Sequence, residues 1–419
     1  MSTPLQPVSK RKNLARIALT SLLLTITLAT GCAKPQSLDG SLHTITKPYA
    51  FSLAGWELKM FTHGTGQPLL ARPDPDGVTK VKQYFDLVPR ISQLQSEISQ
   101  SQDSAQTASL ETQLASLQKQ RDALTPVVET TIEQQIRTVL SEQGIYAPWP
   151  QFFGLKVGFP PVVFGLQNPL NLLVISPRDK IESLRTIMLD PNLTPAQVQQ
   201  IENESDRLGV SSLVVEIGGF AGAYPTFVNN DEDLQSTIVA ATHEWLHQYL
   251  AFRPLGFLYV LDLTGIARNY DIAQMNETVA GMLGDEIGGM VYQKYYAPSE
   301  QQPTQPPPAP DLNAFDFNAA MRQTRLQVDQ LLAQGKVAAA EQYMEQERQF
   351  LATKGYYIRK LNQAYFAFYG TYGDSPTSVS IIGKEMTQLR SNSPSIKSFL
   401  DQASGLTNPQ ELEKLVSTR

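Results

Sequence analysis

The sequence predicts an α+β protein that is mainly helical, and three patterns along its 419 residues support this. Between residues 79 and 145, hydrophobic side chains recur at spacings of three and four, which is typical of a helical coiled coil. Two short runs rich in Leu, Val and Ile, at 171–176 and 211–219, indicate strands. Helical periodicity then returns and fills most of the chain beyond residue 230.

Residues 1–31 have the features of an export signal. Several Lys and Arg residues precede an apolar stretch at 17–29 that is too short for a comfortable membrane span. The stretch ends in Leu-Ala-Thr-Gly-Cys, and Cys32 is the only cysteine of the chain. This resembles a bacterial lipoprotein signal, although Leu28 lies one place earlier than the usual leucine. The resemblance implies a lipidated Cys32 that anchors the protein to a membrane of the cell envelope, on the exported side. The alternative is an uncleaved anchor with an incidental cysteine.

The composition fits a folded protein and argues against one class of partner. The chain is 42% hydrophobic and 18% charged, which is ordinary for a protein that buries a core. Its formal charge is −6, and it has no stripe of basic residues of the kind that nucleic acid requires. We therefore expect no nucleic-acid partner. With Cys32 lipidated, no cysteine remains to form a disulfide.

The N-terminal part beyond the signal is expected to form a tether with short strands at 32–78 and a helical coiled-coil arm at 79–145. The hydrophobic residues that make the narrow seam of the arm are Ile91, Leu94, Ile98, Leu110, Leu114, Leu117 and Leu124. The polar stretch between the two runs predicts two antiparallel helices with a tip near Asp103. Thr125 and Pro126 are expected to open a third helix. Such an arm is a spacer or a docking surface for a protein partner.

The rest of the chain divides by composition into a mixed region at 146–297, a proline-rich loop at 298–312 and a helical region at 313–419. Within the mixed region, residues 176–189 and 193–209 are expected to form helices between the two strands. Thr194 and Pro195 should begin the second of these, because threonine is a good N-cap and proline suits the first helical position.

The stretch ATHEWLHQYLAF, residues 241–252, carries the first chemical signal. Asp231 or Asp233 can cap a helix through it, and His243 and His247 then lie on one side about 6 Å apart, where both imidazoles can reach one tetrahedral zinc ion. Glu244 is turned about 100° away, so it is a poor third ligand but can reach a water molecule at the open coordination position. The alternative is a buried helix whose histidines bond to their neighbours.

A second long helix is expected at 271–296, capped by Asp271, and it contains the segment NETVAG. This segment, together with the His-Glu-x-x-His stretch, resembles the gluzincins, the class of metallopeptidases that includes thermolysin. The resemblance implies that 146–297 is a zincin-like catalytic region and that Glu277 is the third ligand of Zn²⁺. The other candidates for this ligand are Asp262, Asp271 and Glu286. The alternative interpretation of Glu277 is a solvent-exposed helix residue without a role in metal binding.

The same helix carries two further expectations. Gluzincins often have an aspartate four residues after the ligand glutamate, and here that place is Gly281, so Asp285 becomes the candidate to orient a liganding histidine. The small residues Ala280, Gly281, Gly284 and Gly288 should leave a smooth face that packs closely on the histidine helix.

Stabilisation of an oxyanion requires a further donor, and tyrosine is the leading choice because no histidine is spare. The stretch LNQAYFAFYGTYGD offers Tyr365, Tyr369 and Tyr372, of which Tyr365 and Tyr369 are the candidate catalytic residues. This part of the chain is similar to a family of bacterial aminopeptidases, many of them lipoproteins. Ordinary core packing is the other explanation for these tyrosines.

The segment EIGGFAGAYPTF, at 216–227, precedes the histidine helix, where gluzincins often have an edge strand that pairs with substrate. The Gly-x-Met-Glu-Asn segment of many gluzincin aminopeptidases is missing, so endopeptidase and aminopeptidase both stay open.

The sequence thus predicts a membrane-anchored zinc peptidase that acts on peptides or proteins, with Glu244 activating the attacking water. The alternative function is a non-catalytic envelope lipoprotein that binds protein partners through its arm and keeps a structural or vestigial metal site.

Overall fold

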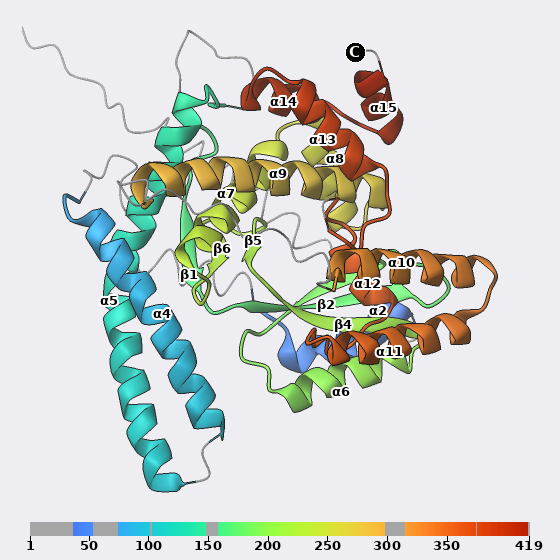
Figure 1. The fold of residues 1–419 in the computed structure, drawn as a ribbon, viewed down its shortest axis with the longest axis horizontal. Helices are drawn as coiled ribbons and strands as arrows, with labels where there is room; N and C mark the ends of the chain where they lie inside the picture. The colour runs from blue at the N-terminus through green and yellow to red at the C-terminus, as the bar shows by residue number, and fades with distance from the viewer. Residues whose placement is uncertain are drawn as a thin grey trace, which may run out of the picture.

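The computed structural model describes residues 37–52, 74–100, 103–147, 158–297, 315–373 and 375–417. Helices dominate the fold, with two small sheets among them (Figure 1), so the predicted α+β, mainly helical class is confirmed. Cys32 and the proline-rich loop at 298–312 lie outside the described residues. Within these ranges, no helix combines the length and the apolar character needed to cross a membrane.

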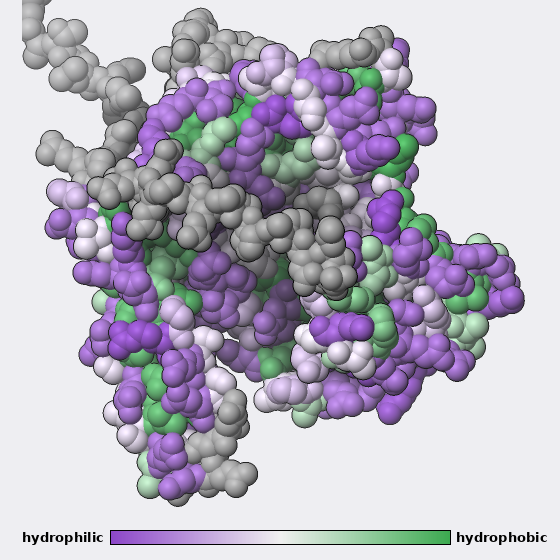
Figure 2. All heavy atoms as spheres, viewed as in Figure 1, coloured by the Kyte–Doolittle hydropathy of each residue, from purple (hydrophilic) through white to green (hydrophobic). Residues whose placement is uncertain are grey.

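The predicted arm is a long antiparallel hairpin that projects from the body (Figure 1) and consists of α4 (Gly77–Gln100) and α5 (Ser104–Glu142). Asp103 lies at the predicted tip and caps α5 by accepting hydrogen bonds from the N–H groups of Ala105 and Gln106. Hydrophobic residues follow the hairpin as a narrow line between hydrophilic ones (Figure 2), as a coiled-coil seam requires.

The prediction of a third helix beginning at Pro126 is wrong, because α5 continues through this residue. Proline removes one helical hydrogen bond. Just beyond it, however, Val128, Ile132 and Ile136 are fully buried in the main core. Their burial outweighs the local cost, since tertiary packing supplies most of the stability of a helix in a protein.

Part of the predicted tether is instead a helix, α2 (Leu38–Thr46), followed by the short η1 (Lys47–Tyr49). Ser37 caps α2, and Leu42 is almost fully buried beside α6 (Pro195–Asp206). Of the predicted N-terminal strands, only Ala50 is seen to pair, in an isolated antiparallel bridge with Leu189, and residues 53–73 lie outside the described part.

The larger sheet has the antiparallel order β3–β2–β4, with β3 (Arg185–Leu189), β2 (Leu170–Pro177) and β4 (Val210–Ile217). Both predicted strands are therefore confirmed. The helix predicted at 176–189 is wrong, because its last five residues are β3, which forms a hairpin with β2. The helix predicted at 193–209 is confirmed as α6, which begins at a complete capping box on Thr194.

Side chains alternate between the two faces of this sheet, as a period of two requires. On β2, Leu173 and Ile175 are buried against α2 and α6, whereas Val174 is buried with Ala364 of α12 (Gln363–Tyr369) on the opposite face. The sheet therefore separates α2 and α6 on one face from α12 on the other.

The smaller sheet has the order β1–β6–β5, with β1 (Phe164–Gln167) parallel to β6 (Thr226–Asn229) and β5 (Gly219–Phe220) antiparallel to it. The predicted edge strand before the histidine helix is thus present as β5. On the opposite edge, the N–H groups of β1 are bonded by α5, where Glu133 accepts from Phe164 and Glu129 accepts from Leu166.

The helical body is built around α9 (Tyr270–Tyr295), which crosses the middle of the molecule (Figure 1). The helix predicted at 271–296 is confirmed, but Asn269 caps it in place of Asp271. The elements that pack on α9 are α5, α7 (Leu234–Leu250), α8 (Pro254–Leu263), α13 (Ile382–Asn392), α14 (Ile396–Ala403) and α15 (Pro409–Ser417). The remaining C-terminal helices are α10 (Phe317–Ala333), α11 (Val337–Thr353) and α12, so the C-terminal region is helical as predicted.

Candidate metal centre

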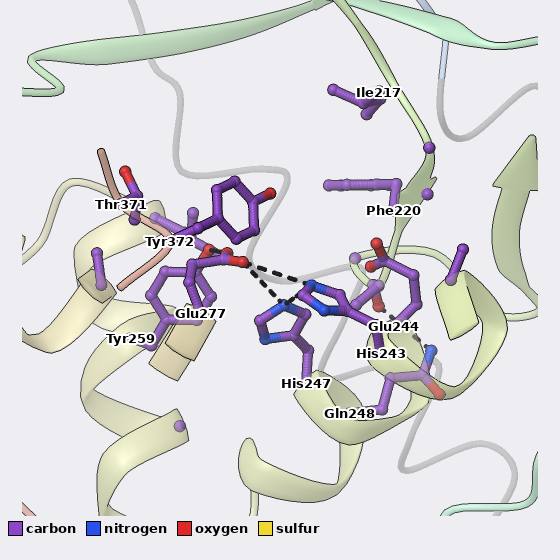
Figure 3. Close-up of a pocket in the computed structure, with 18 of the residues that line it drawn as sticks. Ile217, Phe220, His243, Glu244, His247, Gln248, Tyr259, Glu277, Thr371 and Tyr372 are labelled. Atoms are coloured by element: carbon purple, nitrogen blue, oxygen red, sulfur yellow. Dashed lines mark hydrogen bonds and ion pairs between the residues drawn. The ribbon is translucent and has the colours of Figure 1, made fainter. Parts of the chain in front are cut away.

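Helix α7 brings the two histidines together. Asp233 caps it by accepting a hydrogen bond from the N–H of Ser236, so one of the two predicted caps is confirmed. Trp245 and Leu246 are buried in the main core and fix the rotation of the helix. His243 and His247 then project from another side, and their Nε2 atoms are 3.0 Å apart (Figure 3).

Helix α9 brings Glu277 to the same point. Its Oε2 lies 3.4 Å from Nε2 of His243 and 3.5 Å from Nε2 of His247. The three side chains are only 9–14% exposed. The predicted ligand set is therefore brought together, and the alternative of a solvated Glu277 is excluded by its burial.

The close approach of α7 and α9 depends on two glycines of the predicted smooth face. A Cβ on Gly284 would lie 3.1 Å from Cβ of His243, and one on Gly288 would lie 2.9 Å from Cα of Val239. Gly281 has no atom within 4 Å of the corresponding position and plays no part in this contact.

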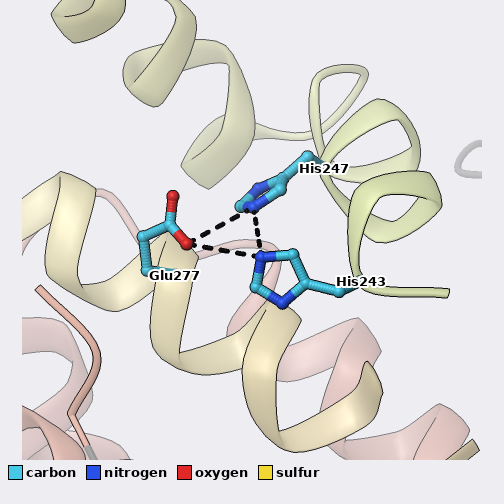
Figure 4. A group of neighbouring side chains, drawn as sticks. All are labelled: His243, His247 and Glu277. Atoms are coloured by element: carbon cyan, nitrogen blue, oxygen red, sulfur yellow. Dashed lines mark hydrogen bonds and ion pairs between the residues drawn. The ribbon is translucent and has the colours of Figure 1, made fainter. Parts of the chain in front are cut away.

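The three donor atoms have the spacing of ligands around one small cation (Figure 4). Their separations are 3.0, 3.4 and 3.5 Å. Tetrahedral zinc, with bonds of about 2.0–2.1 Å, keeps its ligand atoms roughly 3.3 Å apart. The cluster of His243, His247 and Glu277 can therefore hold a metal ion.

Neighbouring side chains turn the lone pairs of the cluster inward. Nδ1 of His247 lies 2.6 Å from Oδ1 of Asn276, an acceptor that keeps a proton on Nδ1, so Nε2 is the nitrogen whose lone pair a metal ion would take in place of a proton. Tyr259 of α8 donates a hydrogen bond of 2.5 Å to Oε1 of Glu277. The other oxygen, Oε2, is buried and has no hydrogen-bond partner among the described residues. Its nearest polar neighbours are the two histidine Nε2 atoms, and a cation at the centre would satisfy this buried oxygen together with them.

The buried carboxylate of Glu277 makes the centre of the cluster favourable for a positive charge. Burial disfavours the charged form of His247, but the carboxylate of Glu277 outweighs it and raises the pKa of His247 to about 9. Burial also acts to raise the pKa of Glu277, yet the two histidines hold that pKa well below its usual value. The pKa of the Tyr259 hydroxyl is raised well above its usual value by burial and by Glu277. Tyr259 is therefore a neutral donor.

Glu244 stands apart from the three ligand candidates, on the side of β5 (Figure 3). A Cβ on Gly219 would lie 2.5 Å from Cγ of Glu244, so the bare glycine leaves room for the carboxylate. Burial raises the pKa of Glu244, while the two histidines and the N–H of Ala221 oppose the shift. Gln248, one turn further along α7, donates to the carbonyls of Ala221 and Ala223 and ties this loop to the helix.

Among the described residues, no strand pairs with the outer edge of β5, which lies beside Glu244. The N–H of Asn229 bonds to the carbonyl of Gly218, and the pairs alternate along an antiparallel ladder. The N–H and carbonyl of Gly219 therefore point away from β6.

Of the three candidate tyrosines in the C-terminal region, two line the cavity of the metal cluster and one does not. Tyr369 and Tyr372 line the same cavity as the histidines, and the ring centres of Tyr372 and His243 are 6.3 Å apart. Tyr372 is held there because the N–H of the next residue, Gly373, bonds to Oγ1 of Thr278. Tyr365 does not line the cavity; its ring packs on that of Tyr369, with 4.5 Å between centres.

The other candidates from the sequence have different surroundings. Asp285 is exposed on the wall of the same cavity, so its role beside a histidine stays a prediction, whereas Asn276 is the partner of Nδ1 of His247. The alternative ligands are used or placed differently: Asp262 accepts from the N–H of Asn269, Glu286 forms a two-pronged ion pair with Arg390, and Asp271 is exposed at the start of α9.

No family model matches the sequence, and the searches of curated proteins and of solved structures returned no match. The chemistry of the site must therefore be inferred from its own geometry.

Proposed function

We propose that the protein is a zinc-dependent peptidase of the gluzincin type. The observation that carries the proposal is the triangle of His243 Nε2, His247 Nε2 and Glu277 Oε2. The carboxylate of Glu244 lies next to this triangle but is not one of its three donors. A catalytic zinc site usually has three protein ligands and keeps its fourth position open for water or substrate. In His-Glu-x-x-His sites the glutamate does not bind the metal and acts as the base.

Zinc suits the donors better than the common alternatives. Two imidazoles and a single carboxylate favour zinc, whereas magnesium and calcium prefer oxygen ligands throughout. When bound, zinc polarises a substrate carbonyl and makes water more acidic.

Glu244 is the general base in this proposal. Its carboxylate lies next to the histidines and is oriented by the N–H of Ala221, so it can accept a proton from an attacking water molecule and pass it to the leaving amine. Tyr372 is the best-placed donor for the developing oxyanion, since its ring is close to His243 and its backbone is fixed on Thr278. Tyr369, on the wall of the same cavity, is the second choice.

The outer edge of β5, which no described strand covers, is where we propose that a peptide binds. An extended peptide can add to an unpaired strand edge through main-chain hydrogen bonds, without regard to sequence. The outward N–H and carbonyl of Gly219 provide this edge next to Glu244. Peptides and proteins are therefore the substrates that fit the site. In this proposal the site belongs to a zincin-like catalytic region, and lipidated Cys32 anchors the protein to the cell envelope.

The projecting arm supports a second candidate function. A hairpin such as α4 and α5, whose tip lies well away from helices α7 and α9 (Figure 1), suits the binding of a protein partner. The protein would then be a non-catalytic envelope lipoprotein in which the metal cluster only stabilises the fold.

Two substitutions separate the candidates. The wild-type protein should bind about one zinc per chain, measured by elemental analysis after dialysis, and Glu277→Gln should lose most of it. Glu244→Gln should keep the zinc yet lose peptide hydrolysis, since it removes only the base. Hydrolysis that survives Glu244→Gln would exclude the mechanism, and a wild-type protein that binds zinc but cleaves no peptide would favour the structural role.

A further inference from the structure

Helix α8 has an apolar face that the core does not use. Leu255 is fully buried in the main core, whereas Phe257 and Leu263 are 56% and 49% exposed. Single exposed apolar residues are common on proteins, but a contiguous group indicates a binding surface.

Phe257 and Leu263 belong to one apolar stripe, with the half-buried Val260 between them, along one wall of the cavity that contains the metal cluster. Phe257, Val260 and Leu263 follow one another at intervals of three, so they lie on one side of the helix. All three line the cavity, together with Phe252 from the preceding turn, which is 39% exposed. We call these four residues the α8 wall.

The α8 wall is continuous with the site. Val260 follows Tyr259 directly, and the hydroxyl of Tyr259 bonds to Glu277. The wall therefore begins within one residue of a side chain that touches a ligand candidate. The cavity has a volume of about 1600 Å³, which is more than a small-molecule ligand needs and leaves room for a chain segment with its side chains.

We infer that the α8 wall binds a large apolar side chain of the peptide substrate and so selects peptides that carry Phe, Leu or a similar residue near the bond that is cut. This inference rests on the proposed function. An apolar side chain leaves water when it lies on the wall, whereas a charged or polar one loses its hydration without gaining a partner. A change of this kind in a hydrophobic subsite is worth about tenfold or more in kcat/KM.

The test uses matched peptides that differ at one position, Phe or Leu against Ser or Glu, with the position moved along the peptide. Binding is measured on zinc-loaded Glu244→Gln by fluorescence anisotropy, so that the result does not depend on turnover. Cleavage of the same peptides is measured on the wild-type protein. We expect the apolar peptides to bind and to be cleaved about tenfold better or more.

Phe257→Ser and Val260→Ser, each introduced alone, should reduce this preference about tenfold while zinc content stays the same. The matched control is Phe350→Ser, because Phe350 of α11 is 43% exposed but lies outside the cavity. Cleavage without any apolar preference, or a preference that persists in both α8 variants, would overturn the inference and leave the peptidase standing. Selective binding without cleavage by the wild-type protein would support the α8 wall and reject the peptidase.

Discussion

The hydroxyl of Tyr259 donates a hydrogen bond to Oε1 of Glu277, so α8 and α9 meet at one oxygen of the candidate metal ligand. The other oxygen, Oε2, faces Nε2 of both His243 and His247. One hydrogen bond therefore decides which oxygen of Glu277 is turned toward the centre of the cluster. Tyr259 acts as a positioning residue, because it touches a ligand candidate and not the metal.

Removal of that hydroxyl should weaken metal binding without abolishing it. In Tyr259→Phe the carboxylate of Glu277 is free to rotate, and we expect the Kd for zinc to rise about 10- to 100-fold, as for other partners of metal ligands. Competition with a chromophoric chelator measures this Kd. Tyr365→Phe is the control, since its ring lies outside the cavity. An unchanged Kd in Tyr259→Phe would contradict the positioning role.

Gly219 is expected to be essential for the position of the Glu244 carboxylate but not for zinc binding. A Cβ at this position would lie 2.5 Å from Cγ of Glu244, so Gly219→Ala must displace the carboxylate. We expect kcat/KM for peptide cleavage to fall about 100-fold, because a displacement of about 1 Å has effects of this size. Zinc content should stay at the wild-type level.

The neighbouring glycine provides the control for this change. Gly218 has no atom within 4 Å of its would-be Cβ, so Gly218→Ala adds the same methyl group without displacing Glu244. It should keep at least half of the wild-type activity. An equal fall of kcat/KM in both variants would mean that this strand tolerates no side chain. The effect of Gly219→Ala could then not be attributed to a displaced Glu244.

The ligand candidates could be predicted from the sequence because each lies in a local pattern. His243 and His247 are four apart in one helix, and Glu277 lies in a segment with a family resemblance. Asn276 adjoins Glu277, yet nothing in the sequence indicates that it faces His247. Tyr259 was missed altogether, because its contact with Glu277 depends on how α8 packs on α9, and this is a property of the tertiary structure.

The errors in the fold have the same origin. Pro126 reads as a helix start, but Val128 and Ile132 are buried just beyond it and carry α5 through. The strand β3 begins after a charged stretch that favours a helix, and only its pairing with β2 shows otherwise. In both places a local preference of about 1–3 kcal/mol is outweighed by packing or pairing with distant residues.

The packing of α7 on α9 is expected to be sensitive to one methyl group. In Gly288→Ala the new Cβ would lie 2.9 Å from Cα of Val239, and backbone atoms cannot move aside cheaply. We expect the free energy of unfolding to fall by about 1–3 kcal/mol, as for other overpacked sites. Urea denaturation measures the change.

Gly289 gives a matched comparison, since no atom lies within 4 Å of its would-be Cβ. Gly289→Ala should raise the free energy of unfolding by about 0.5–1 kcal/mol, because alanine is the better helix former. A stabilising effect of both substitutions would show that the helices are not in close contact at Gly288.

The contact between α5 and the edge of β1 should make stability depend on pH. Glu129 accepts a hydrogen bond from the N–H of Leu166, and burial raises its pKa to about 8 from a usual value of 4.5. The folded protein therefore holds this proton more tightly than the unfolded chain. The stabilisation is fully present below about pH 4.5 and is lost as the pH rises toward about 8.

Glu129→Gln should remove the part of this dependence that comes from Glu129, because the amide can still accept the hydrogen bond from Leu166 but does not ionise, whereas Glu133, whose pKa burial raises to about 7, still titrates in both proteins. Between about pH 5 and pH 8.5 the wild-type protein should lose about 2 kcal/mol relative to the variant, less than the full shift implies because the side chain is only half-buried. Urea midpoints at the two pH values measure the difference, with Glu111→Gln on the exposed arm as the control. If the wild-type protein and Glu129→Gln change in parallel with pH, then Glu129 is ionised in the folded protein and the edge of β1 is held by a carboxylate throughout.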